Sequence, residues 1–228
     1  MKVENKNKIL EEVQATDFFD KLPAEIHGFT LKKIFAESDD KFIYFSYENI
    51  KIHRAVIAYF HEETLEYKIR VRIGLTEFCI DKFFTSNFAD YCEKISSELD
   101  KIIESFLDNH ENQNSLIIEK KIAQWAYGKN LPSKIFNFEL FITPQNPVEI
   151  TNGSFIIINY SDFTAASDFT ITYNIYTENF SAEFTKNHVS QVNYIFDSDS
   201  LAELEKNLQA NLSAEISRIS DNFHGREQ

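Results

Sequence analysis

The sequence is poor in the residues that build flexible loops, tight turns and covalent cross-links. Its 228 residues include only five glycines, four prolines and two cysteines. So few glycines leave no Gly-rich loop of the kind that binds nucleotide phosphates, and collagen-like or low-complexity character is excluded as well. No apolar run approaches the roughly 20 residues that a membrane-spanning helix requires. We therefore expect a globular protein that binds no nucleotide through a glycine loop and does not cross a membrane.

Both cysteines, Cys79 and Cys92, lie in the first half of the chain. The matching places in the second half hold Val192 and Glu205, so a disulfide or metal site common to both halves is not expected. We interpret the cysteines as unlinked thiols in a reducing compartment. The first residues lack the apolar core of a signal peptide, so the expected location is the cytoplasm.

Acidic residues outnumber basic ones along the whole chain. Residues 1–113 hold 15 basic and 22 acidic residues, and residues 114–228 hold 8 and 14, which together give the formal net charge of −13. Such a surface repels nucleic-acid backbones and anionic membranes. Basic proteins and small ligands held in a pocket remain as partners, although acidity also serves solubility alone.

The chain contains two copies of one pattern. Residues 22–31 read LPAEIHGFTL and residues 131–140 read LPSKIFNFEL. Residues 42–47 read FIYFSY and residues 155–160 read FIIINY. The copies share mainly apolar residues, whereas most polar residues at matched places differ. The duplication therefore predicts a common core and no common active site.

Each half begins with apolar residues near helical spacing, at 9–19 and at 118–127, followed by Leu-Pro. Proline disfavours helical geometry in the residue before it, so both helices should end there. Strands follow, and residues 65–73 alternate apolar and charged side chains as in a strand with one wet face. Residues 42–47 are apolar on both faces, which predicts an interior strand.

Each half ends in a long amphipathic helix, with Asn87 and Ser200 at the matching N-cap positions. Ser200 and Glu203 form a capping-box pattern. Steps of three and four residues put the apolar side chains on one face of each helix. These are Phe88, Tyr91, Ile95, Leu99, Ile103 and Phe106 in the first helix, and Leu201, Leu204, Leu208, Leu212, Ile216 and Ile219 in the second.

The predicted fold class is α+β. The unit is a two-layer arrangement of a helix, an antiparallel meander of four to five strands and a long helix. It occurs twice, at residues 1–113 and 114–228, and we expect a pseudo-twofold axis to relate the halves, because a duplicated chain behaves like a covalent dimer. The halves could form one continuous sheet or pack face to face, and the chain could be a monomer or a homodimer.

The residue patterns of the sequence predict no catalytic residues, no metal ligands and no cofactor. His61-Glu62-Glu63-Thr64-Leu65 begins like a zinc-protease helix, but the second histidine is missing and the segment is a predicted turn. The carboxylate pairs Asp39-Asp40 and Glu62-Glu63 also fall in predicted turns, where solvated charge is the simpler interpretation. No nucleophile elbow or Cys–His protease context occurs.

Two segments hold weak candidates for ligand binding. Trp125 and Tyr127 lie where the first half passes to the second and could line a groove there, although Trp125 could equally pack a helix onto the sheet. Asp162 and Asp168 flank a loop rich in hydroxyl residues, which could bind a polar ligand or a cation or could be a plain connection.

Three functions remain open. The favoured one is a non-enzymatic, acidic protein-binding module, chaperone-like or inhibitor- and immunity-like, that binds a basic or apolar partner. The helix–meander–helix order and the acidity resemble secretion-chaperone folds, which act as dimers of acidic α+β units. The alternatives are a small-ligand-binding protein, with a pocket between helix and sheet or at the seam of the repeats, and an enzyme of an unrecognised class.

Overall fold

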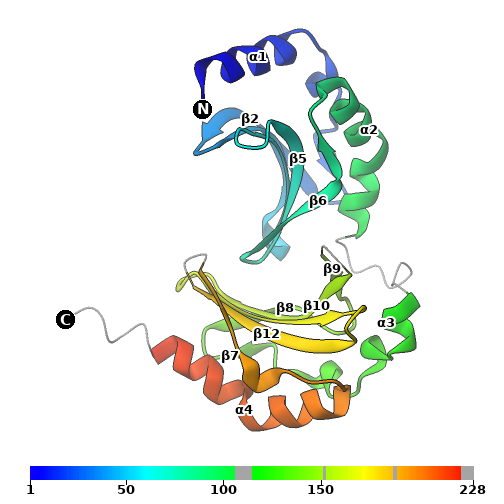
Figure 1. Cartoon of the computed structure of the whole chain (residues 1–228), viewed down its shortest axis with the longest axis vertical. Coiled ribbons are helices and arrows are strands. Elements are labelled where there is room, and N and C mark those ends of the chain that lie inside the picture. Colours follow the sequence, from blue (N-terminus) through cyan, green and yellow to red (C-terminus); the bar gives the residue numbers. More distant parts are fainter. Residues whose placement is uncertain (106–114, 151–152, 187–188, 222–228) are drawn as a thin grey trace, which may run out of the picture. The chain divides into compact units, whose positions relative to one another are not determined.

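The computed structural model describes residues 1–105, 115–150, 153–186 and 189–221. It is an α+β protein with two antiparallel sheets (Figure 1). The chain divides into two compact units, one of Met1–Ile73 with Glu77–Leu107 and the other of Gly74–Thr76 with Asp108–Gln228. Among the described residues, no helix has both the length and the apolar character needed to cross a membrane.

The first unit is a helix, a six-stranded meander and a long helix. The sheet order follows the chain from β1 to β6, so every strand pairs with its neighbour in sequence. The elements are α1 (Val3–Gln14), η1 (Phe18–Asp20), β1 (Glu25–Ile26), β2 (Phe29–Ser38), β3 (Lys41–Asn49), η2 (Ile50–Ile52), β4 (Arg54–His61), β5 (Glu66–Ile73), β6 (Thr76–Thr85) and α2 (Phe88–Ser105).

The second unit has a comparable order of strands and ends in the longest helix. Its sheet runs β13-β12-β11-β10-β8-β7, and β9 pairs with β10 beside β8. The elements are α3 (Ser115–Glu119), η4 (Ile122–Gln124), η5 (Gly128–Asn130), β7 (Lys134–Ile135), β8 (Phe138–Ile142), β9 (Val148–Glu149), β10 (Ser154–Asp162), β11 (Ser167–Asn174), β12 (Asn179–Lys186), β13 (Val189–Val192), η6 (Tyr194–Phe196) and α4 (Leu201–Asp221).

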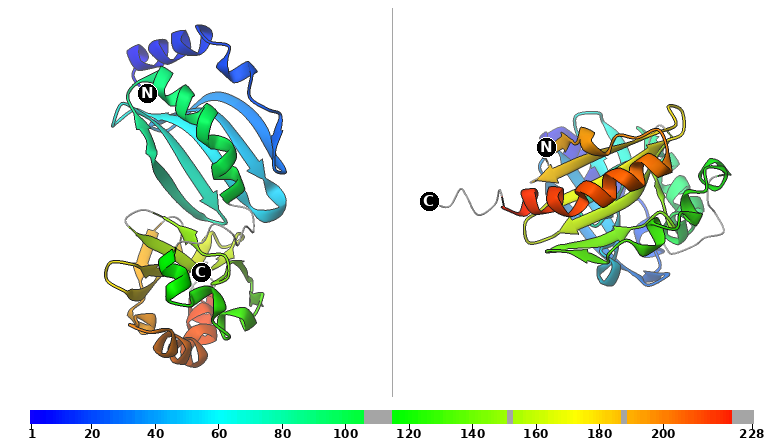
Figure 2. Two further views of the ribbon diagram at one scale, coloured as in Figure 1. Left: turned by 90° about the vertical axis from the view of Figure 1, so that its right-hand side faces the viewer. Right: turned by 90° about the horizontal axis from the view of Figure 1, so that it is seen from below.

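The two long helices confirm the predicted apolar faces. Each lies along one face of its own sheet (Figures 1 and 2). The buried positions of the predicted faces are Tyr91, Ile95, Leu99 and Ile103 in α2, and Leu204, Leu208, Leu212 and Ile216 in α4. Phe106, predicted to end the first face, falls outside the described residues.

The predicted caps form at both helix starts. The Asn87 side-chain oxygen accepts a hydrogen bond from the Asp90 backbone nitrogen at 3.1 Å, and the Ser200 hydroxyl accepts one from the Glu203 nitrogen at 3.2 Å. The Glu203 carboxylate in turn accepts from the Asp199 nitrogen rather than from that of Ser200. In a standard capping box the glutamate would accept from the nitrogen of the N-cap residue itself, so here the second bond goes to the preceding residue.

The prediction of one continuous helix at 118–127 is wrong, because the helix is interrupted. Lys121 adopts the left-handed conformation, with φ 58°, and the Trp125 backbone is not helical, with ψ 115°. The segment is therefore a short α3 followed by the separate turns η4 and η5. Apolar spacing alone could not reveal the break, because the buried side chains of Ile122 and Trp125 still reach the core.

A bulge explains why residues 42–47 look apolar on both faces. Ile43 pairs with Tyr59 and Phe45 with Ala58, so Tyr44 is an extra residue in β3. A bulge puts two successive side chains on the same side of the strand. Ile157 is the corresponding extra residue in β10, between the pairs of Ile156 and Ile158. The interior position of β3 is confirmed, but its apolar run comes from the bulge.

The first core is built largely from aromatic rings. Five aromatic rings form a chain of contacts in which the centroids of neighbouring rings are at most 6.3 Å apart. The rings belong to Phe19, Tyr44, Tyr67, Tyr91 and Phe88. The Tyr91 hydroxyl donates to the Lys68 backbone oxygen at 2.8 Å, and Tyr67 donates to Glu12 of α1. The buried Tyr44 hydroxyl has no hydrogen-bond partner among the described residues. Burial raises the pKa of all three tyrosines above the ordinary phenol value.

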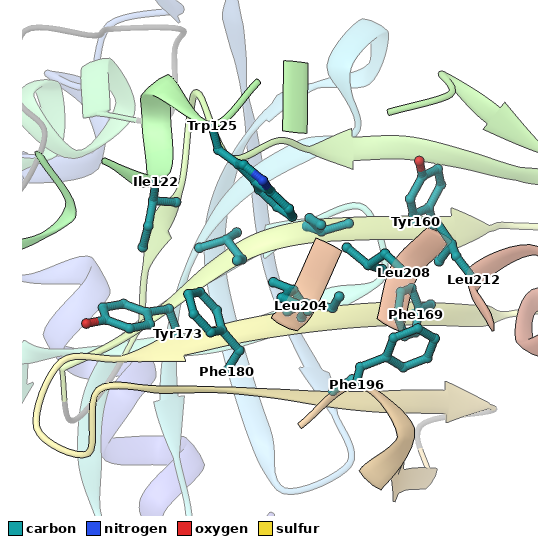
Figure 3. Packing of buried hydrophobic residues seen from close by; sticks show 14 of the residues in the cluster. Ile122, Trp125, Tyr160, Phe169, Tyr173, Phe180, Phe196, Leu204, Leu208 and Leu212 are labelled. Carbon is teal, nitrogen blue, oxygen red and sulfur yellow. The ribbon is translucent and has the colours of Figure 1, made fainter. Parts of the chain in front are cut away.

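The core of the second unit mixes aliphatic and aromatic side chains between α4 and its sheet (Figure 3). Phe169 stacks near Phe184 and Phe196, with centroids 4.8 and 5.1 Å away. Leu204, Leu208 and Leu212 of α4 belong to the same cluster. The single tryptophan of the chain therefore reports on this core, because Trp125 is part of it.

Truncation of either helix face should destabilise its unit. We expect Leu99→Ala and Leu212→Ala each to lower the free energy of unfolding by about 2–5 kcal/mol, since both leucines are buried. Leu10→Ala, at a partly exposed position of α1, should cost less than about 1 kcal/mol. Urea unfolding followed by circular dichroism measures all three. A urea midpoint equal to that of the parent protein for either core variant would contradict the assigned faces.

The same change, tyrosine to phenylalanine, should affect stability differently at Tyr44, whose hydroxyl is unpaired, and at Tyr91, whose hydroxyl is bonded. Tyr44→Phe should leave stability unchanged or raise it by up to about 1 kcal/mol, because it removes a buried hydroxyl that has lost its water partners. Tyr91→Phe should cost about 1 kcal/mol, because it breaks the bond to the Lys68 oxygen. Chemical denaturation of both variants tests this, and equal losses would contradict it.

Candidate functional site

Trp125 and Tyr127 lie on the helix side of the second unit. The Trp125 ring packs in the core (Figure 3). Its centroid lies 5.5 Å from that of Tyr127. Its indole nitrogen donates to the Glu205 carboxylate of α4 at 3.0 Å. Burial raises the pKa of Tyr127. These contacts connect the turns before β7 to α4.

Asp162 and Asp168 lie on the two strands of one hairpin. The Asp162 carboxylate accepts hydrogen bonds from the backbone nitrogens of Thr164 and Ala165, at 2.9 and 3.1 Å, and so closes the β10–β11 turn. Asp168 pairs with Ser161 across the hairpin. Burial raises the pKa of Asp168, and a hydrogen bond with the Thr185 side chain opposes that shift. Asp162 therefore has a structural role in the turn.

The second face of this sheet, opposite the core, is polar. Side chains alternate along β11, so Asp168, Thr170 and Thr172 lie opposite Phe169 and Ile171. The Asn159 amide donates to the Thr170 hydroxyl at 3.0 Å, and Thr172 bonds Ser181 at 2.9 Å. Trp125 and the aspartate of β11 therefore lie in different layers of the unit.

The second face of the first sheet carries ionisable groups instead. The Tyr59 hydroxyl lies 3.2 Å from the Cys79 sulfur, and the Arg70 guanidinium stands 5.6 Å from the Tyr59 ring centroid. Arg70 also forms an ion pair with Glu77 at 2.9 Å. Burial raises the pKa of Tyr59, so its phenol is protonated at neutral pH. The other cysteine, Cys92, lies on α2 and not on this face, and burial raises its pKa to about 11, which keeps that thiol protonated.

Two turns of the first unit bring a histidine and two carboxylates together. The β2–β3 turn supplies Asp40, the last residue of β4 is His61, and the β4–β5 turn supplies Glu63. Their ligand atoms lie within 4.8 Å of one another. The sequence placed these acids in separate solvated turns. Alternate turns of a meander lie at the same end of its sheet, and that rule, applied to the sequence, would have paired them.

The strand β13 forms an exposed, uncharged edge of the second sheet. It consists of Val189, Ser190, Gln191 and Val192, all exposed, and it pairs with β12 only among the described strands. Tyr194 and Ile195 of the adjoining η6 are also exposed, Tyr194 by 77%. We call these four strand residues with Tyr194 and Ile195 the β13 edge. The sequence does not predict this strand, because four residues with apolar side chains only at the ends carry little periodic signal.

Comparison of the chain with protein-family models, curated proteins and solved structures finds no match. Function is therefore inferred from the geometry of the chain itself. The features that bear on it are the β13 edge, the ionisable face of the first sheet and the turn cluster of Asp40, His61 and Glu63.

The bond between Trp125 and Glu205 should contribute measurably to the second unit. We expect Glu205→Ala to lower the free energy of unfolding by about 1–2 kcal/mol, because it leaves the indole nitrogen without its charged acceptor. Lys206→Ala, at the next and exposed position, is the matched control. Trp125 emission during urea unfolding measures both. An unchanged midpoint for Glu205→Ala would contradict this role.

Proposed function

We propose that this chain is a non-enzymatic protein-binding module and that the β13 edge binds an extended segment of a basic partner. The observation that carries the proposal is an exposed edge strand without charge. Such a strand presents unpaired backbone groups to which another chain can add a strand. Val189 and Val192 offer apolar contacts at the two ends of β13, and Tyr194 extends the surface beyond it.

The two units treat their last strands differently, which supports this assignment. β6 is the corresponding edge of the first sheet, and it carries Glu77, Asp81 and Lys82. Charged side chains on an edge strand are a common protection against unwanted pairing. β13 has no such protection, although the whole chain is rich in charge. We infer that its edge is kept available for a partner.

The charge of the chain favours a basic partner over a second copy. The net charge of −13 attracts a cationic segment and speeds its association. Two copies of the chain would bring equal negative charges together. Glu183 of β12, which pairs with Val192, adds a local carboxylate beside the strand. The proposed occupant is therefore an extended segment that alternates lysine or arginine with apolar residues.

We further propose that the two units descend from one duplicated ancestor. The Tyr47 hydroxyl donates to the Pro23 oxygen at 2.7 Å, and the Tyr160 hydroxyl donates to the Pro132 oxygen at 2.8 Å. These residues occupy matching places in the repeated sequence. The bulges at β3 and β10 also fall at matching residues, 113 positions apart by the numbering (157 − 44). In this proposal the protein works in the cytoplasm, where Cys79 and Cys92 stay as free thiols.

A peptide-binding experiment tests the proposed interface. The probe is a short synthetic peptide of alternating lysine and valine, and its control carries glutamate in place of lysine. We expect the full chain to bind the lysine peptide at least about tenfold more tightly, with a loss of affinity at high salt. Hydrogen exchange at the β13 amides should slow in the complex.

The variant Val189→Lys with Val192→Lys should abolish this binding, because it adds to β13 the charged protection that β6 has. Ile50→Lys, at an exposed apolar position of the first unit, is the matched control and should bind like the parent chain. Equal binding of both peptides, or retained binding by the double variant, would overturn the assignment. Concentration-dependent dimerisation that the double variant abolishes would instead identify a second copy as the occupant.

A further inference from the structure

We propose that the turn cluster of Asp40, His61 and Glu63 is a binding site for a divalent transition-metal ion of the Zn²⁺ class. The site lies at the end of the first sheet where the β2–β3 and β4–β5 turns meet. It offers one imidazole nitrogen and two carboxylate oxygens, with ligand atoms within 4.8 Å of one another. Zn²⁺ binds both donor types, and three protein ligands leave a position open for water or another ligand.

The histidine is already oriented for coordination. Its Nδ1 lies 3.0 Å from the Thr64 hydroxyl, which leaves Nε2 to face Asp40. Histidines that bind metals commonly use their second ring nitrogen in this way, because the bond fixes the ring. Thr64 is thus the outer partner of the proposed ligand His61.

The two turns are also tied together by backbone. The Glu62 nitrogen donates to the Asp40 oxygen at 2.8 Å, and Lys41 pairs with His61 in the β3–β4 register. The positions of Asp40 and His61 are therefore set by the sheet. Glu63 is exposed, and its long side chain can close onto an ion with little cost to the fold.

The geometry requires only a small adjustment. His61 Nε2 lies 2.8 Å from one Asp40 oxygen, which is hydrogen-bond distance. Two ligands on a tetrahedral Zn²⁺ stand about 3.3 Å apart, given metal–ligand bonds of about 2.0–2.1 Å. The pair must separate by about 0.5 Å, while the Glu63 oxygen moves inward. A metal ion then lies between the two atoms, which now contact each other directly.

Lys41 distinguishes a metal site from a simple ion-pair cluster. Its ammonium lies 2.7 Å from the other Asp40 oxygen and competes with a cation for that carboxylate. If the cluster is only an ion-pair network, removal of Lys41 brings no gain in metal affinity. If it binds a metal, Lys41→Met should tighten binding, because it leaves both Asp40 oxygens available.

The experiment titrates the full chain with Zn²⁺ by calorimetry and follows Co²⁺ binding by its visible spectrum. We expect stoichiometric binding that falls about tenfold or more in His61→Ala and in Glu63→Gln, and that rises severalfold in Lys41→Met. His27→Ala is the matched control, because His27 pairs with Asp100 at 3.4 Å without belonging to the three-residue cluster.

Glu63→Gln changes an exposed side chain, so it remains informative if His61→Ala fails to fold. Parent-like Zn²⁺ affinity in Glu63→Gln, or an equal loss in His27→Ala, would overturn the site. The test is independent of the β13 edge, which lies in the other unit. Peptide binding by the chain can therefore succeed or fail without affecting this result.

Discussion

Each unit depends on one constraint, which is that a long amphipathic helix must bury its apolar face against one face of an antiparallel sheet. α2 and α4 meet it with side chains at steps of three and four residues, and both helices begin at capped residues. Burial of this kind is the main favourable contribution to folding. Because one sheet face is given to the helix, the other is left to carry polar or ionisable groups.

The sequence was sufficient for the parts of the fold that follow from periodicity. The faces of α2 and α4 and the alternation of β5 repeat over many residues, so their apolar side chains could be assigned to the core in advance. The charged face of β5 was predicted to be wet, but Lys68 is buried and the other charged residues of the strand are half-buried. The break at Lys121 and the bulge at Tyr44 each depend on one residue with an exceptional backbone or register. Neither changes the apolar pattern enough to be recognised from sequence alone.

The candidate sites were harder to predict, because they combine residues that are distant in sequence or unremarkable in composition. From sequence, Asp40 and Glu63 are simply charged residues of two separate turns. Only the folded meander brings these turns together at one end of the sheet. β13 could be recognised as an edge strand only from the order of strands in the folded sheet. Trp125, by contrast, was noticed for its rarity, and its ring serves the core and α4.

One hydrogen bond in each unit connects the start of the meander to a strand in its interior. The Tyr47 hydroxyl of β3 donates to the Pro23 oxygen, and the Tyr160 hydroxyl of β10 donates to the Pro132 oxygen. Both bonds form although the secondary structure upstream of the two prolines differs. α1 is a continuous helix of 12 residues, whereas α3, η4 and η5 form a broken path to the same kind of hairpin. The segments ahead of Pro23 and Pro132 can therefore differ in helical content, provided that each still supplies buried side chains to its core, as Ile9 and Trp125 do.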